Sequence, residues 1–311
     1  MSEKKTHKIE QADIITPNIK PGETALVFQR HGKYNRDRSS DSAGSLFEDS
    51  ARDIKDKDKE WFDKVLSDNG DDVHILFVSS DTQYANKGFR SMETGQLAQH
   101  AAVEAMTERG IDPNEGIINF NKNFKTARFA QTDQDIRPVA GIREPDIFNP
   151  ADKEYITFLQ RTYGYADEIS KTGLSPKAWA IHEMDREAGI RETTGAEGQQ
   201  NLIDRTKKSL ATLERYSRVW HINNPGKKLV IWATSHYDTL NPLIKEVEGQ
   251  LYNSDGSFAD TYQPVDFGGG IVIKFSKDSL PTLESRIHKN SLVLGHAATR
   301  LSATRLDLPR Y

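Results

Sequence analysis

The chain has 311 residues, of which 36% are hydrophobic and 28% are charged, and this length allows a large buried core. The formal net charge of −4 gives no reason to expect nucleic acid or an anionic membrane as a partner. Cysteine is absent, which excludes disulfides, thiolate nucleophiles and cysteine-based zinc sites.

A buried strand is the first element that the sequence predicts, after a polar lead-in over residues 1–22. Thr24 to Phe28 are aliphatic, aromatic or β-branched, which favours a strand covered on both faces. Arg30, His31 and Gly32 follow, and the glycine predicts a sharp turn. His31 is therefore expected at the C-terminal end of a central strand, where open α/β sheets bind their ligands.

The next segments predict a loop, a helix, a second strand and a second helix. Residues 33–49 have the composition of a surface loop, which could cover the site or be a solvated insertion. A helix is expected over 50–67 and a strand over 74–78, which runs into Ser79 and Ser80. A helix then opens near Arg90, where backbone N–H groups and the helix dipole favour an anion.

The second half of the chain predicts two more strands. Residues 111–137 are hard to assign, apart from a possible short strand at 117–120. Helices are expected over 151–171, from about 195 to Val219, and over 241–248, whereas 176–184 fits strand or helix. A buried strand at 228–234 runs into His236, a late strand covers 268–275, and residues 277–311 predict a C-terminal appendage in the form of a helical arm.

These elements together predict an α/β protein, a three-layer α/β/α sandwich with a mostly parallel central sheet. Their order resembles the histidine phosphatase superfamily, which has the phosphoglycerate-mutase-like fold. The resemblance implies a catalytic domain over 23–276. It also implies that His31 is the nucleophile and that Arg30 and Arg90 bind phosphate. By the same resemblance, His236 is the second catalytic histidine and Glu144 is the general acid.

Other positions complete or depart from this resemblance. Gly195 to Glu197 with Arg205 matches a structural landmark of the family, whereas the loop at 81–88 and the long segment 111–137 are additions. Tyr237 stands where many members have glycine. Glu183 is a second candidate for the general acid, or a surface carboxylate, and no His-Glu-x-x-His spacing supports a metal site around it.

The expected function is hydrolysis of a phosphate monoester through a phosphohistidine intermediate, without a metal or other cofactor. A phosphomutase and a non-catalytic phospholigand-binding module remain as alternatives. The expected partner is a small phosphorylated substrate, with no nucleic acid and no membrane. The chain contains no run of about 18 apolar residues and no apolar signal region at its start, so the cytoplasm is the expected location. The sequence does not indicate the substrate or the oligomeric state.

Overall fold

A computed structural model describes residues 16–84, 87–118, 136–144, 197, 199–236, 239–240, 265, 267–276, 279–287 and 304–305. Strands and helices alternate over most of this length. The strands are β1 (Thr24–Arg30), β2 (Val73–Ser79), β3 (Arg137–Pro138), β4 (Lys228–Ser235), β5 (Gly270–Ser276), β6 (Ser279–Ile287) and β7 (Thr304–Arg305). The helices are α1 (Glu48–Asn69), α2 (Arg90–Glu108), α3 (Pro113–Gly116), the 3-10 turn η1 (Ala140–Ile142) and α8 (Gln199–Asn223).

The described strands form one seven-stranded sheet in the order β3-β2-β4-β1-β5-β6-β7. The pairs β3-β2, β2-β4 and β4-β1 are parallel, and β5 is antiparallel to β1. The predicted α/β class with a mostly parallel central sheet is confirmed, because β1, β2 and β4 all run the same way at its centre. Their C-terminal ends therefore meet at one edge of the sheet.

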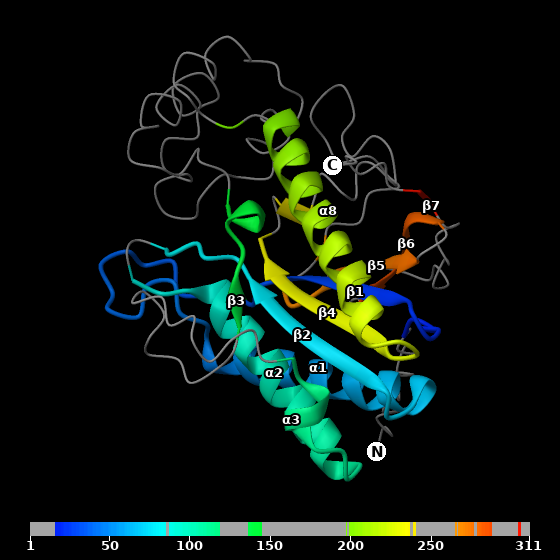
Figure 1. Ribbon diagram of the computed structural model, residues 1–311. Helices are drawn as coiled ribbons and strands as arrows, with labels where there is room; N and C mark the ends of the chain where they lie inside the picture. The colour runs from blue at the N-terminus through cyan, green and yellow to red at the C-terminus, as the bar shows by residue number, and fades with distance from the viewer. Residues whose placement is uncertain are drawn as a thin grey trace, which may run out of the picture.

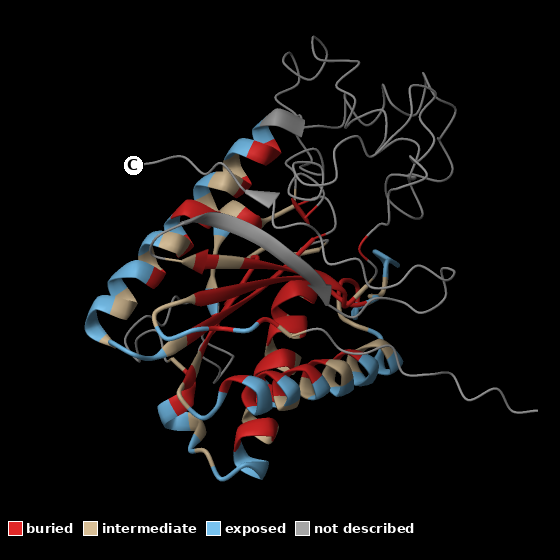
Figure 2. Ribbon diagram, turned by 90° about the vertical axis from the view of Figure 1, so that its right-hand side faces the viewer, coloured by how far each residue is buried: buried red, intermediate tan, exposed pale blue. Residues whose placement is uncertain are grey.

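Helices cover both faces of the sheet, as the prediction of three layers requires (Figure 1). Helices α1 and α2 pack on one face and on each other, and α8 lies across the other face. In Figure 2 the sheet is buried between these layers, and the helices turn their exposed residues outward. The amphipathic patterns seen in the sequence therefore have a partner surface on each side.

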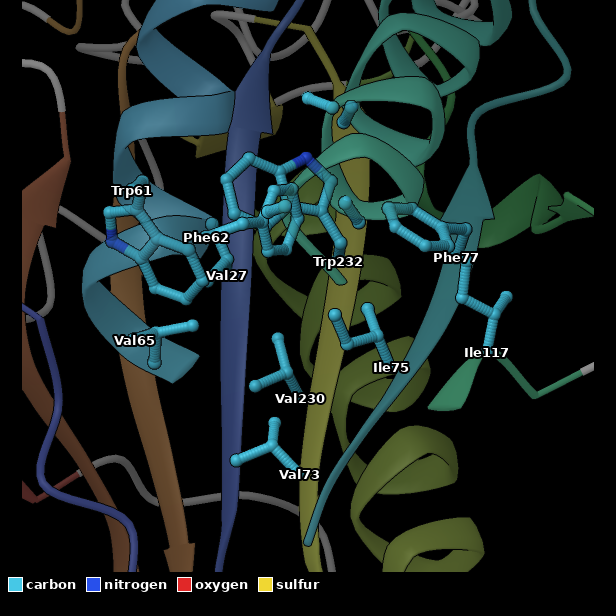
Figure 3. Close-up of a cluster of buried hydrophobic side chains, with 14 of the residues drawn as sticks. Val27, Trp61, Phe62, Val65, Val73, Ile75, Phe77, Ile117, Val230 and Trp232 are labelled. Carbon is cyan, nitrogen blue, oxygen red and sulfur yellow. The ribbon is translucent and has the colours of Figure 1, made fainter. Parts of the chain in front are cut away.

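The core under α1 and α2 is built around aromatic rings (Figure 3). The Trp232 ring of β4 lies 5.0 Å from the Trp61 ring and 4.7 Å from the Phe62 ring, both of which belong to α1. All three side chains are fully buried. Since a buried aromatic side chain contributes several kcal/mol, roughly 3–5 by truncation, these rings fix α1 against the strands that carry the histidines.

The core on the other face joins α8 to the same strands. Its members include hydrophobic residues at alternate positions of β1, β2, β4 and β5, together with Leu210 and Leu213 of α8. The strands are thus buried on both faces, which explains why their sequences are continuous hydrophobic runs without polar alternation.

The structure describes part of the segment near each end of the chain. Past residue 276 we expected a helical arm, and this was wrong over Ser279–Ile287, because that segment is β6 and pairs antiparallel with β5. Near the start, Ile19 is 2% exposed and its N–H donates to Asn69 at the end of α1, so this part of the lead-in is packed. The proposed domain boundaries remain predictions.

Several expectations fall on parts of the chain that the structure does not describe. These are the helices at 151–171 and 241–248, the ambiguous segment 176–184, Glu183, and Tyr237. Of the possible strand at 117–120, Ile117 forms an isolated parallel bridge with Ile75, and residues 119–120 lie outside the described ranges. Within the described ranges, the helices are either too short or too polar to cross a lipid bilayer.

Candidate active site

The site lies where the three central parallel strands end. His31 follows β1, Ser80 follows β2 and His236 follows β4, while Arg90 is the first residue of α2. Two backbone hydrogen bonds hold these strand ends in register: His31 N–H donates to the Ser235 carbonyl at 2.9 Å, and Ser80 N–H donates to the Thr234 carbonyl at 2.8 Å. The two histidine rings lie 5.2 Å apart between their centroids.

Hydrogen bonds to both ring nitrogens fix the tautomer of His31. Arg90 Nε lies 3.1 Å from His31 Nε2, and a guanidinium can only donate, so Nε2 must carry the lone pair. His31 Nδ1 lies 2.8 Å from the Gly32 carbonyl oxygen. It therefore carries the proton and donates a hydrogen bond to this oxygen. The imidazole is thus held with its nucleophilic nitrogen facing Arg90.

Arg90 is completely buried and contacts the other site residues. One of its terminal nitrogens forms an ion pair with the Glu144 carboxylate and lies 3.4 Å from His236 Nδ1. The structure therefore brings together four of the five residues singled out from the sequence: His31, Arg90, Glu144 and His236.

A chain of hydroxyl groups orients His236. Ser80 Oγ donates to Thr82 Oγ1 at 3.0 Å, so Ser80 is free to accept from His236 Nε2 at 2.9 Å. This assignment agrees with the contact on the other ring nitrogen, where Nδ1 accepts from Arg90. Ser91 Oγ lies 3.3 Å from the same Nε2. Thr82 Oγ1 also accepts a hydrogen bond from the Glu144 backbone N–H at 3.0 Å, so the hydroxyls of Ser80 and Thr82 together connect His236 to Glu144.

The segment before Glu144 is held by Arg205 of α8. Its guanidinium donates to the carbonyl oxygens of Arg143 at 3.2 Å and Glu144 at 3.3 Å, and it pairs with the Glu197 carboxylate at 2.8 Å. This contact gives a physical reason for the Glu197 and Arg205 landmark in the sequence. The Glu144 side chain is 17% exposed, so its carboxyl group lies at the boundary between the buried site and solvent.

Gly32 is required for space rather than for a special backbone angle. It does not have a positive φ, in contrast to Gly22 or Gly268, so the sharp turn that we predicted from it does not explain its presence. A Cβ atom here would lie 2.4 Å from Ile54 Cδ1 and 2.9 Å from Ser50 Oγ of α1. The Gly32 N–H donates to Thr94 Oγ1 of α2 at 3.1 Å, so close packing against both helices sets the position of His31.

Burial and positive charge keep both histidines neutral. Burial lowers the pKa of His31 well below its usual value of 6.5, and the charges of Arg90, Arg30 and Arg36 lower it further. The pKa of His236 is also lowered well below 6.5, by burial first and then by Arg90. At neutral pH, His31 Nε2 therefore keeps its lone pair.

Arg30 directly precedes His31, and its guanidinium is held by two contacts. Its guanidinium donates to the Val265 carbonyl at 2.7 Å and lies 3.9 Å from the centre of the Phe267 ring. The Phe267 ring is in turn 5.8 Å from the His31 ring. Arg30 thus places a positive charge next to the nucleophile, and its role in binding phosphate remains a prediction.

Two tyrosines beside the site were not singled out from the sequence. The Tyr34 ring lies 5.2 Å from the His31 ring, and the Tyr84 ring lies 5.2 Å from the Tyr34 ring. The Arg90 guanidinium carbon lies 4.4 Å from the centre of Tyr34 and 5.2 Å from that of Tyr84. Each tyrosine lies in a loop just after a strand that is directly followed by a site residue. This position in the sequence is the signal that could have indicated that the tyrosines lie near the site.

No cluster of three or more His, Asp or Glu side chains that could hold a metal ion occurs among the residues that the structure describes. The cations found near His31 are arginines, and they can interact with phosphoryl oxygens directly.

Comparisons with known proteins give structural matches and no sequence match. No family model matches the sequence, and no curated protein matches it significantly. Similar solved structures include a phosphoglycerate mutase from Bacillus anthracis, with a TM-score of 0.46 and 16% identity over 86% of this chain and 93% of the other. Two other similar solved structures are phosphatases.

A mycobacterial glucosyl-3-phosphoglycerate phosphatase has a TM-score of 0.41 and 14% identity, covering 80% of this chain and 89% of the other. A phosphoserine phosphatase from Entamoeba histolytica has a TM-score of 0.43 and 13% identity, covering 87% and 100%.

Proposed function

We propose that this protein is a phosphatase of the histidine phosphatase type, which hydrolyses a phosphate monoester through a phosphohistidine intermediate on His31. The observation that carries the proposal is the position of Arg90. A single buried guanidinium contacts His31 Nε2, His236 Nδ1 and the Glu144 carboxylate. A phosphoryl group bound to Arg90 would therefore meet a nucleophile, a second imidazole and a proton donor.

The first step joins His31 to phosphorus. The lone pair of Nε2 attacks in line, the N–P bond forms and the bond from phosphorus to the leaving oxygen breaks. The Nδ1 proton stays on the ring. Its hydrogen bond to the Gly32 carbonyl oxygen stabilises the positive charge that develops on the imidazole. Because the pKa of His31 is lowered, the nucleophile needs no prior deprotonation at neutral pH.

Fixed donors stabilise the charge on the transferred phosphoryl oxygens. Arg90 is buried, so its charge acts in a site of low dielectric and needs little reorganisation. His236 Nδ1 carries a lone pair, because it accepts a hydrogen bond from Arg90. To donate to a phosphoryl oxygen, Nδ1 must carry a proton, which the ring gains either by protonation or by a change of tautomer in which Ser80 donates to Nε2; a bound dianion favours both electrostatically.

Glu144 is the proposed general acid. Its carboxylate is paired with Arg90. When phosphate takes the place of this carboxylate on the guanidinium, the dianion beside Glu144 favours proton uptake by the carboxyl group. The proton passes to the leaving oxygen in the first step. In the second step Glu144 takes a proton from the water that attacks phosphorus, the N–P bond breaks and phosphate is released.

The test compares the purified protein with two histidine variants in buffer containing EDTA. A panel of phosphate esters is assayed for phosphate release and for an acid-labile phosphoenzyme. We expect activity in the unmodified protein, loss of both signals in His31→Ala, and retention of both in His100→Ala, because His100 is exposed on α2.

The alternatives give different outcomes. Transfer of phosphate between positions of one substrate, without release, would identify a phosphomutase. Binding of phosphate esters without turnover would identify a binding module. Activity that survives His31→Ala would refute the assignment of the nucleophile.

A further inference from the structure

Two loops meet beside the site: the predicted surface loop after His31 and the added loop after Ser80. The first loop, residues 33–47, follows β1, and the second, residues 81–84 and 87–89, follows β2. The Gly88 N–H donates to the Ala43 carbonyl at 2.9 Å, and a Cβ atom at Gly88 would lie 2.4 Å from the backbone carbon of Gly44. Lys87 Nζ also donates to the Ser40 carbonyl at 2.7 Å. The loops therefore touch backbone to backbone and form one unit, which we call the paired loops.

Two tyrosines of the paired loops each lie near Arg90 and near one arginine of the first loop. The Tyr34 ring centre lies 4.4 Å from the Arg90 guanidinium carbon and 5.5 Å from that of Arg36. Tyr84 has Arg90 at 5.2 Å and Arg38 at 5.7 Å. Arg90 is buried in the site, whereas Arg36 and Arg38 are exposed. The exposed arginines thus lie about one aromatic ring away from the group proposed to bind phosphate.

Two acidic side chains of the first loop, Asp37 and Asp41, have partners within the paired loops. The Asp37 carboxylate accepts hydrogen bonds from Ser39 N–H at 2.9 Å and Ser39 Oγ at 2.6 Å, and these bonds lower its pKa. Asp41 lies 3.7 Å from Lys87 Nζ. The charge of Arg36 contributes to the low pKa of His31, so its field reaches the nucleophile. The paired loops therefore present a second positive region close to the first.

We propose that the substrate is doubly anionic: its leaving group carries a second anionic group, a carboxylate or a phosphate, that binds Arg36 and Arg38 while its body packs against Tyr34 and Tyr84. Guanidinium groups pair well with both kinds of anion. The spacing by one aromatic ring calls for a short leaving group. The inference rests on the proposed phosphatase function and names the substrate class for the same site.

Matched aryl phosphates provide the test. The full chain is assayed with para-carboxyphenyl phosphate, with its neutral counterpart para-carbamoylphenyl phosphate, and with hydroquinone bisphosphate. We expect kcat/KM to be about tenfold higher for a doubly anionic ester than for the neutral one, the size of one charge-assisted contact. The better of the carboxylate and bisphosphate esters identifies the second anion.

Variants assign this preference to the arginines. In the double variant Arg36→Gln with Arg38→Gln, the ratio of kcat/KM between anionic and neutral esters should fall towards one. Arg218→Gln is the matched control, because Arg218 is an exposed arginine near the C-terminus of α8, at the opposite end of the sheet. Higher salt should weaken the preference of the unmodified protein, since exposed charges are screened.

The outcomes separate this inference from the function beneath it. Equal hydrolysis of all three esters by the unmodified protein, or a ratio unchanged in the double variant, overturns the second-anion site and leaves the phosphatase standing. If none of these esters, nor any ester of the wider panel, is hydrolysed or forms a phosphoenzyme, the phosphatase proposal fails and the inference fails with it. A ratio that falls equally in Arg218→Gln would show a general charge effect and would also overturn it.

Discussion

Arg90 Nε and His31 Nε2 are joined by a hydrogen bond of 3.1 Å in which the arginine is the donor. The contact aligns the group proposed to bind phosphate with the lone pair of the proposed nucleophile. Thr94 Oγ1 strengthens this alignment, because it donates to the Arg90 carbonyl at 2.8 Å and accepts from the Gly32 N–H at 3.1 Å. Helix α2 and the end of β1 therefore hold each other in place around the reacting atoms.

Replacing Arg90 with lysine should remove most of the activity. Lysine keeps the charge but cannot contact His31, His236 and Glu144 together, because it lacks the planar fork of donors. We expect kcat/KM to fall by about 100-fold or more, the usual cost of losing a fixed transition-state donor. Steady-state kinetics check this, with circular dichroism to confirm folding. A loss below about fivefold would contradict the central role of Arg90.

Glu144→Gln should slow esters with poor leaving groups far more than esters with good ones. The amide cannot donate a proton to an alkoxide, whereas para-nitrophenolate leaves without one. We expect kcat/KM to fall by about 100-fold for an alkyl phosphate and by less than about tenfold for para-nitrophenyl phosphate. Equal losses for the two esters would mean that Glu144 is not the general acid, and Glu183 would then be tested in the same way.

Ser80→Ala should disturb His236 without unfolding the protein. The serine accepts from His236 Nε2, and its removal leaves Ser91 Oγ at 3.3 Å as the remaining acceptor. The expected loss is about 1–3 kcal/mol of interaction energy, which would appear as a lower kcat and a changed tautomer balance. Nitrogen NMR shifts of the His236 ring report that balance. Ser217→Ala is the control, because Ser217 is a buried serine on α8 away from the site, and it should leave the His236 signals unchanged.

Stability should decrease as the pH falls below about 6.5. The pKa values of His31 and His236 are lowered in the folded protein and return towards 6.5 on unfolding. Below that pH the unfolded chain binds protons that the folded chain does not, so the free energy of unfolding falls by up to about 1.4 kcal/mol per pH unit for each histidine. Above about pH 7 the two histidines contribute no slope.

Denaturant unfolding between about pH 7 and pH 5 measures this slope. The double variant His31→Asn with His236→Asn should have a flatter profile over the same range. His74 and His221, whose pKa values are also lowered by burial, remain in both proteins and cancel in the comparison. Identical slopes would show that the two site histidines are protonated equally in the folded and unfolded states.

Gly88→Ala should separate the paired loops. The added Cβ atom would lie 2.4 Å from Gly44 C and 2.5 Å from Ser45 N, and backbone atoms cannot move aside as a side chain can. We expect a loss of about 1–3 kcal/mol in stability together with a higher KM, because Tyr84 and Arg38 would shift. Gly110→Ala is the comparison: it has open space and a φ of +74°, so its cost of about 1 kcal/mol should leave KM unchanged.

The sequence alone determined the central strands and the position of His31 and His236 at their ends. Continuous hydrophobic runs such as those of β1, β2 and β4 can only be buried on both faces, and a polar residue after such a run must lie at the edge of the sheet. The direction of β5 and the existence of β6 were not determined, because a hydrophobic run has the same pattern in parallel and antiparallel pairing.

The tertiary structure decided which side chains meet. Glu144 lies 54 residues from Arg90 in the chain, and Tyr34 lies 50 residues from Tyr84, so no local pattern could pair them. Hydrogen bonds from Arg205 and to Thr82 position the Glu144 backbone for its ion pair with Arg90. The close approach of Gly44 and Gly88 brings Tyr34 and Tyr84 together. Local hydrophobic patterns specify strands and helices, whereas contacts between distant loops depend on the packing of the whole sheet and its helices.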